Sequence, residues 1–155
     1  MAQKATKRWR SDMAKRGKWR SKEAIEIAVK AGLDALRTGG EAILTEAINE
    51  TPIDTGTLRR SGTVTVGGLP NSEQVYKAAE AGTEHKNAFP EPVGKEKAVY
   101  VSFNTPYARR QHEEIGYNHP LGGGPKYLEN PFNRNKKKVA CMAELRIKKA
   151  LRDTE

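Results

Sequence analysis

The chain has 155 residues, a net charge of +9 and a single cysteine. This length predicts one domain with extensions, and the lone Cys141 excludes an internal disulfide bond. No apolar run approaches the roughly 18 residues that a membrane span needs. We therefore expect a protein without membrane contact, made in a reducing cytoplasm.

Positive charge is concentrated at both ends. Residues 1–22 carry nine Lys or Arg and one acid, and residues 134–155 carry eight bases and three acids. Leu, Ile, Val and Phe together number only 27, so the core is small for the length, and composition alone borders on that of disordered chains. We expect a modest folded domain that gains stability from neighbouring subunits.

Residues 1–21 are predicted to form a basic, tryptophan-containing arm. Cationic side chains interleaved with two indoles can lie on phosphates or on an acidic protein surface, and a free solvated tail is the alternative. The candidate contacts to a partner or to DNA are Lys7, Arg8, Trp9, Arg10, Lys15, Arg16, Lys18, Trp19 and Arg20.

A long helix is predicted over residues 22–50, with Ser21 as its N-cap and Pro52 just beyond its end. Its apolar face recurs at spacings of three, four or seven. Gly39-Gly40 interrupts the pattern and predicts a kink or break. The face consists of Ile25, Val29, Leu33, Leu36, Ile43 and Ala47.

The stretch "PIDTGTLRRS", residues 52–61, contains the Asp-Thr-Gly triplet of aspartic proteases. Such a protease needs its aspartate after a buried strand, with a pKa that the site keeps high. Here a helix end and Pro52 precede Asp54, and Arg59 and Arg60 follow it, which would lower that pKa. We interpret Asp54 as the cap of a short helical turn anchored by Leu58, with both arginines projecting outward.

Alternation predicts strands over residues 62–69 and 97–104. Residues 73–81 fit either a strand or a helix, and we favour a strand that pairs with residues 97–104. Two prolines, a glycine and mixed charges make residues 83–96 a predicted exposed loop.

Two hydroxyl-or-amide-plus-proline pairs, Thr105-Pro106 and Asn130-Pro131, predict helix starts. The first helix covers residues 107–115, with Ala108, Gln111, His112 and Ile115 on one side. The second helix runs to residue 152, and apolar residues at a spacing of four form the stripe that we expect to be buried. That stripe is Val139, Ala143, Ile147 and Leu151. The expected fold class is α+β: a long N-terminal helix and a C-terminal helix packed on a small antiparallel sheet, as one domain over residues 22–152 with a tail at 153–155.

Other residues that could carry chemistry have plainer interpretations. His112 and His119 match no zinc spacing, so we expect no metal, cofactor or catalytic residue. "LGGGPK", residues 121–126, lacks the ending of a phosphate loop and is interpreted as a flexible hinge. Cys141 is interpreted as a half-buried thiol.

Three motifs in this order resemble the head–tail joining proteins of long-tailed bacteriophages, also described as neck, tail-completion or minor capsid proteins. The resemblance covers about residues 22–152. Its residues are Pro52, Asp54, Thr55, Gly56, Leu58, Arg59 and Ser61; Pro106, Tyr107, Ala108 and Glu113; and Lys126, Tyr127, Leu128 and Pro131. The arm and the proline-rich loop at 83–96 have no counterpart in the pattern.

The resemblance implies a non-enzymatic ring subunit, a hexamer in that family, at the portal–tail junction of the virion. Its implied partners are copies of itself, the adjacent portal or adaptor protein, and a tail-terminator or tail-tube protein, with nonspecific contact to packaged DNA. A small nucleic-acid-binding protein that grips phosphates with its basic ends is the alternative. Arg59 and Arg60 are further candidate contacts to a partner or to DNA.

Overall fold

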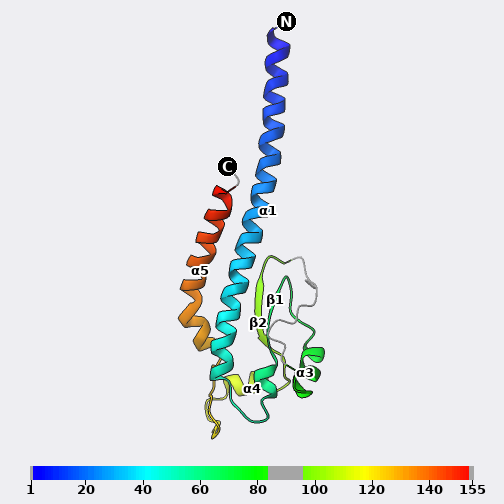
Figure 1. Cartoon of the computed structure of the whole chain (residues 1–155). Coiled ribbons are helices and arrows are strands. Elements are labelled where there is room, and N and C mark those ends of the chain that lie inside the picture. The colour runs from blue at the N-terminus through cyan, green and yellow to red at the C-terminus, as the bar shows by residue number, and fades with distance from the viewer. Residues whose placement is uncertain (1, 84–95, 154–155) are drawn as a thin grey trace.

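The computed structural model describes the backbone of residues 2–83 and 96–153, and the side chains of residues 21–83 and 96–153. Two long helices and a two-stranded antiparallel sheet dominate it, which confirms the predicted α+β class (Figure 1). The elements are α1 (Ala2–Glu50), α2 (Thr57–Arg60), β1 (Gly62–Val66), α3 (Ser72–Glu80), β2 (Val99–Phe103), α4 (Ala108–Glu113) and α5 (Glu129–Arg152).

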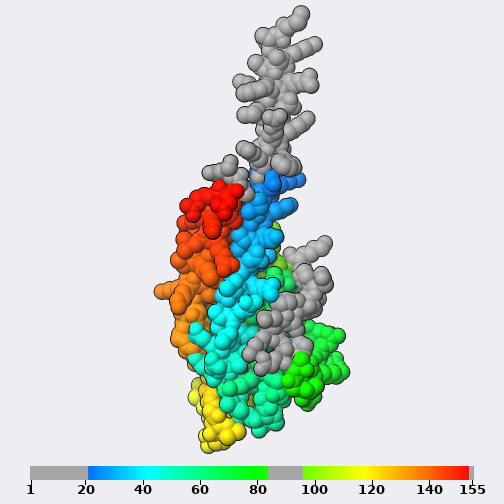
Figure 2. Space-filling model, in the orientation of Figure 1, coloured from blue at the N-terminus to red at the C-terminus, as the bar shows by residue number. Residues whose placement is uncertain are grey.

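Helix α1 lies between α5 and the sheet (Figure 1). Gly32 of α1 contacts Ile147 and Gly39 contacts Val139, so α5 runs antiparallel to α1. In the space-filling view α5 lies flush along the flank of α1 (Figure 2). Gly40 faces the valines of the sheet on the other side.

The break predicted at Gly39-Gly40 is wrong, because α1 continues through both glycines. A Cβ on Gly39 would lie 2.4 Å from Cγ1 of Val139, and one on Gly40 would lie 3.2 Å from Cγ1 of Val64. Successive residues of a helix point about 100° apart, so the pair serves two different interfaces. The glycines are there to admit two neighbouring layers, and their helix propensity is overridden by that packing.

The predicted start of α1 at residue 22 is also wrong, because the helix already begins at Ala2. Alanine, lysine and arginine are strong helix formers, and they fill most of residues 2–20. Ser21 therefore lies inside the helix and is not its N-cap. The contacts predicted for Trp9, Trp19 and the arm's cations lie outside the residues whose side chains are described.

Strands β1 and β2 lie where the alternation predicts, and they pair with each other from Gly62–Phe103 to Val66–Val99. The pairing predicted between residues 97–104 and residues 73–81 is therefore wrong. The strand favoured over residues 73–81 is wrong, because this segment is helix α3. Asn71 accepts a hydrogen bond from the backbone of Gln74 at 3.2 Å, and Val75 and Ala79 are buried one turn apart. An N-cap with buried residues at i and i+4 decides an ambiguous segment in favour of helix. The loop predicted at 83–96 lies almost entirely outside the described residues.

The two later helices are close to their predicted bounds. In α4 Ala108 is buried, whereas Ile115 lies beyond the end of the helix and is 76% exposed, so the predicted helix extends too far. In α5 Ala143 is buried and the other three stripe residues are half-buried, as expected. The α1 stripe also holds from Val29 onward, but Ile25 is 58% exposed.

Within the described residues, no helix is both long and apolar enough to cross a lipid bilayer.

Candidate functional site at the junction of three motifs

One residue from each of the three motifs meets the others in a buried cluster. Leu58, Ala108 and Tyr127 form it, and Phe103 and Leu128 pack against it. The rings of Phe103 and Tyr127 meet edge to face with centroids 5.0 Å apart, a favourable aromatic geometry. The predicted anchoring role of Leu58 is confirmed. We call this cluster the motif junction.

Tyr127 is the centre of the motif junction, with only 1% of its surface exposed. Its hydroxyl donates a hydrogen bond to the carbonyl of Ala108 at 2.9 Å, and its ring meets that of His112 edge to face at 4.9 Å. Burial raises the pKa of the Tyr127 phenol well above its usual value. The phenol therefore stays neutral, which a buried donor requires.

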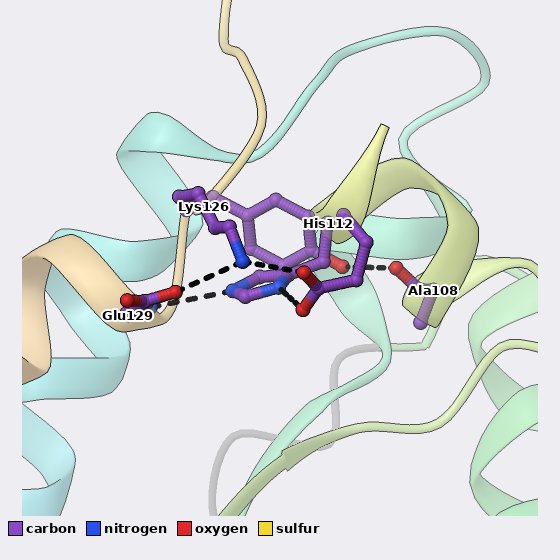
Figure 3. Close-up of polar contacts among 6 residues, drawn as sticks. Ala108, His112, Lys126 and Glu129 are labelled. Carbon is purple, nitrogen blue, oxygen red and sulfur yellow. Dashed lines mark hydrogen bonds and ion pairs between the residues drawn. The ribbon is translucent and has the colours of Figure 1, made fainter. Parts of the chain in front are cut away.

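A polar cluster around His112, Lys126 and Glu129 lies beside the motif junction (Figure 3). The ammonium of Lys126 pairs with Glu113 and, at 3.1 Å, with Glu129. The backbone N–H of Glu129 lies 3.3 Å from Nε2 of His112, and Nδ1 of His112 lies 2.8 Å from Glu113. In neutral His112 Nε2 thus accepts, so Nδ1 carries the proton and donates to Glu113. The cluster ties the end of α4 to the start of α5.

The carboxyl of Glu113 is held ionised by its neighbours. The hydrogen bond from Lys126, followed by that from His112, lowers the pKa of Glu113 below its usual value. In turn the bond to Glu113, and then the bond to Glu129, raises the pKa of Lys126. All four side chains, those of His112, Glu113, Lys126 and Glu129, hold two helix ends together.

Arg59 and Arg60 turn back onto the chain, so the prediction that they project outward is wrong. Arg59 donates through Nη2 to the carbonyl of Thr51 at 2.8 Å and to that of Asn49 at 3.2 Å, and Arg60 donates through Nε to Ala79 at 2.8 Å. The last carbonyls of a helix carry partial negative charge and lack intrahelical donors. The two arginines therefore cap the ends of α1 and α3.

The cap predicted at Asp54 is wrong. The N-cap of α2 is Gly56, at φ 79°, and no side chain caps that helix. A capping side chain must stand on the residue directly before the helix, and Asp54 is two residues too early. Thr55 instead shares a hydrogen bond with Thr57, between hydroxyls 2.9 Å apart. The carboxylate of Asp54 is exposed.

Asn104 is a residue that the sequence pattern did not single out. Its side chain is buried and donates to the carbonyl of Ser61 and the hydroxyl of Thr63, each at 3.0 Å, and accepts from Ser72 at 3.2 Å. It thereby fastens the end of β2 to the motif turn and to α3. The sequence offered one sign of this role: Asn104 is an amide at the end of the strand predicted over residues 97–104, directly before the helix start predicted at Thr105.

The loop at 121–126 is fastened, so its interpretation as a hinge is wrong. Ile53 donates to the carbonyl of Gly122, and Gly124 donates to that of Glu50. Gly123, at φ 81°, lies so close that a Cβ there would be 2.5 Å from the carbonyl oxygen of Thr51. Only glycine permits that backbone conformation and that contact.

The remaining motif residues differ in burial. Pro52 is buried at the end of α1, while Pro106 and Tyr107 are exposed before α4. Ser61 is buried, and its hydroxyl donates to Leu58 at 2.7 Å. The three motifs are thus the parts of one fastening between helix ends.

Comparisons of this chain with protein-family models, with curated proteins and with solved structures gave no match.

Two apolar surface grooves lie away from the motif junction. The first, the α1 groove, has a volume of about 340 Å³ and is formed chiefly by Ile25, Val29, Leu33 and Val66, with Glu26 and Asp34 among its charged residues. The second, the α5 groove, has a volume of about 380 Å³ and is lined by Cys141, Met142 and Leu145 between Lys138, Arg146 and Lys149.

The α5 groove faces away from α1. Leu145 is 60% exposed, and Cys141 is exposed where the sequence predicts a half-buried thiol. The stripe that packs on α1 lies on the other side of the same helix, so apolar residues occupy both of its sides.

Proposed function

We propose that this chain is a non-enzymatic structural subunit of a ring in the neck of a long-tailed bacteriophage. The ring would join the capsid portal or adaptor to the tail-terminator or tail-tube protein, around the channel for DNA. In the resembling family such rings have six copies. The proposed location is the virion, with assembly in the host cytoplasm.

The observation that carries the proposal is the presence of two apolar grooves on different faces. The α1 groove lies beside the sheet, and the α5 groove lies on the opposite side of the layered body. Two different patches that fit one another make a heterologous contact, which closes into a ring when the rotation allows it. A single self-complementary patch would favour a dimer.

Charge can fix only the register of this pairing, because the two acids and two lysines of the α1 groove sum to zero. Lys138, Arg146 and Lys149 surround the α5 groove, and Glu26 and Asp34 lie in the α1 groove, together with two lysines. Opposite charges at the rim would fix the register of the contact, while the apolar residues supply most of its free energy. The resemblance in the three motifs gives the ring its place in the virion.

The mass of the assembled species tests the ring. We expect light scattering after size exclusion to give a closed oligomer, and Leu145→Glu in the α5 groove to give a monomer. Ala140→Glu, at an exposed α5 position outside the groove, is the matched control and should leave the assembly intact. A wild-type chain that stays monomeric at all concentrations would end the proposal. In virions, loss of the chain should leave heads and tails unjoined.

A nucleic-acid-binding protein is the second candidate, favoured by the antiparallel packing of α1 and α5. This packing brings the basic last turns of α5, including Lys149 and Arg152, toward the half of α1 that continues into the basic segment (Figure 1). A mobility-shift titration over salt separates the candidates. Tight binding with a steep salt dependence favours a dedicated binder, and weak nonselective binding favours the ring subunit.

A further inference from the structure

A separate cleft opens beside the motif junction, away from both grooves. Its volume is about 280 Å³, and its walls come from the link between α1 and α2, the start of α4 and the loop that follows α4. Ile53 and Tyr107 supply its apolar surface, and Asp54, Gln111 and His119 supply its polar groups. We call it the Asp54 cleft.

Its polar groups lack partners. Oε1 of Gln111 and Nε2 of His119 are buried and make no hydrogen bond, two of the three such side-chain atoms among the described residues. Among the residues whose side chains are described, the carboxylate of Asp54 also makes neither a hydrogen bond nor an ion pair. Buried polar atoms in folded proteins are almost always bonded. Their convergence in one cleft indicates a group that arrives from outside.

The electrostatics of the cleft favour a cation. Burial raises the pKa of the Tyr107 phenol, and the negative charge of Asp54 adds to that rise. Arg60, in the same turn, is already committed to the carbonyls of Ala79 and Thr55. Arg60 does not lie within ion-pair distance of Asp54 among the described contacts, so no cation of this turn occupies the carboxylate.

We propose that the Asp54 cleft binds an arginine side chain presented by a partner polypeptide. A guanidinium brings several N–H donors in one plane, and the cleft offers acceptors at Asp54, Gln111 and, in the tautomer with a free Nε2 lone pair, His119. The ring of Tyr107 provides a face for the cation, and Ile53 lies where the aliphatic stem would pack.

The size of the cleft suits a single side chain. Sites for drug-sized molecules occupy roughly 300–1,000 Å³, and the Asp54 cleft lies just below that range. Lysine would satisfy the charge, but its single ammonium cannot span separate acceptors as a fork does. This inference concerns a different surface from the two grooves and holds whether or not the chain forms a ring.

Methyl NMR of the full chain, labelled at isoleucine, tests the proposal in rings and monomers alike. The probe is N-acetyl-arginine methylamide, and its uncharged isostere N-acetyl-citrulline methylamide is the control ligand. We expect the Ile53 signal to shift with a Kd on the order of 1–10 mM, the affinity of a few kcal/mol that one side chain provides. Ile147, half-buried against α1, is the internal reference and should not move.

Two variants locate the binding. Asp54→Asn should weaken it about tenfold or more, whereas Asp153→Asn, a carboxylate exposed at the end of α5, should leave it unchanged. Gln111→Met should weaken it less than Asp54→Asn. Because the Asp54 side chain is exposed and unbonded, its variant is expected to fold, and the unchanged Ile147 signal verifies this.

Three results would overturn the proposal. One is equal binding of the arginine and citrulline derivatives, and another is unchanged binding in Asp54→Asn. The third is no shift of Ile53 up to about 20 mM of probe, several times the expected Kd. Free arginine that binds at least about tenfold tighter than the blocked derivative would assign the cleft to a small molecule and so also exclude a polypeptide.

Discussion

The backbone of Gly39 in α1 lies directly against the side chain of Val139 in α5. A Cβ at position 39 would come within 2.4 Å of one valine methyl and 2.7 Å of the other, which is closer than carbon atoms approach. The two longest helices are therefore in contact at a point that admits no side chain on α1.

We predict that Gly39→Ala destabilises the fold by roughly 1–3 kcal/mol, because overpacking outweighs the gain in helix propensity. The free energy of unfolding from urea titration measures this. Gly32→Ala is the matched control, since its Cβ would meet only the flexible end of Ile147 at 3.2 Å. Val139→Ala in the Gly39→Ala background should recover part of the loss. Additive costs in that double variant would contradict the contact.

Removing the hydroxyl of Tyr127 should cost about 1 kcal/mol, the net value of one buried hydrogen bond. The change is Tyr127→Phe, which keeps the ring and its contacts with Phe103 and His112. Tyr76→Phe is the control, because that hydroxyl bonds to Glu80 on an exposed face, and it should change stability by less than about 0.5 kcal/mol. Equal effects of both changes would argue against a special role for the junction.

Arg59→Met should destabilise the fold by roughly 1–3 kcal/mol, since the carbonyls of Thr51 and Asn49 lose a charged donor. Asp54→Ala, in the same motif, should change stability by less than about 0.5 kcal/mol because its carboxylate makes no bond in the described structure. Thermal unfolding of both variants gives the comparison. Alanine removes any capping oxygen, so a larger effect of Asp54→Ala than of Arg59→Met would restore the capping role that the sequence suggested.

The carboxyl of Glu113 should titrate below its ordinary pKa, as NMR of its side chain can measure. A carboxyl whose pKa is lower in the folded chain stabilises it above the unfolded pKa, and this contribution is lost as the pH falls through the folded value. Lys126→Met removes the largest cause and should move the Glu113 pKa back toward 4.5. Lys148→Met, which acts on Glu144, should leave Glu113 unchanged.

The local spacing of apolar residues was sufficient to predict the helices and strands that bury one face. The stripe Val139, Ala143, Ile147 and Leu151 predicted α5, and alternation predicted β1 and β2, because each buries one face. The segment 73–81 was misjudged because a short apolar pattern fits both periods, and the cap at Asn71 outweighs the preference for a strand. The start of α1 was misplaced because the basic segment lacks a core-facing stripe but consists of good helix formers.

What the sequence by itself determined is the α+β class, the helical and strand periods and the identity of three motifs. That these motifs meet around Tyr127, that Gly39 and Gly40 face two different layers, and that Arg59 caps α1 while Asp54 is left unpaired were decided only by the tertiary structure. The physical reason is the distance along the chain over which each interaction acts. Period, propensity and caps act over a few neighbours in the chain, whereas a buried contact or a helix-end hydrogen bond depends on residues tens of positions away being brought together by packing.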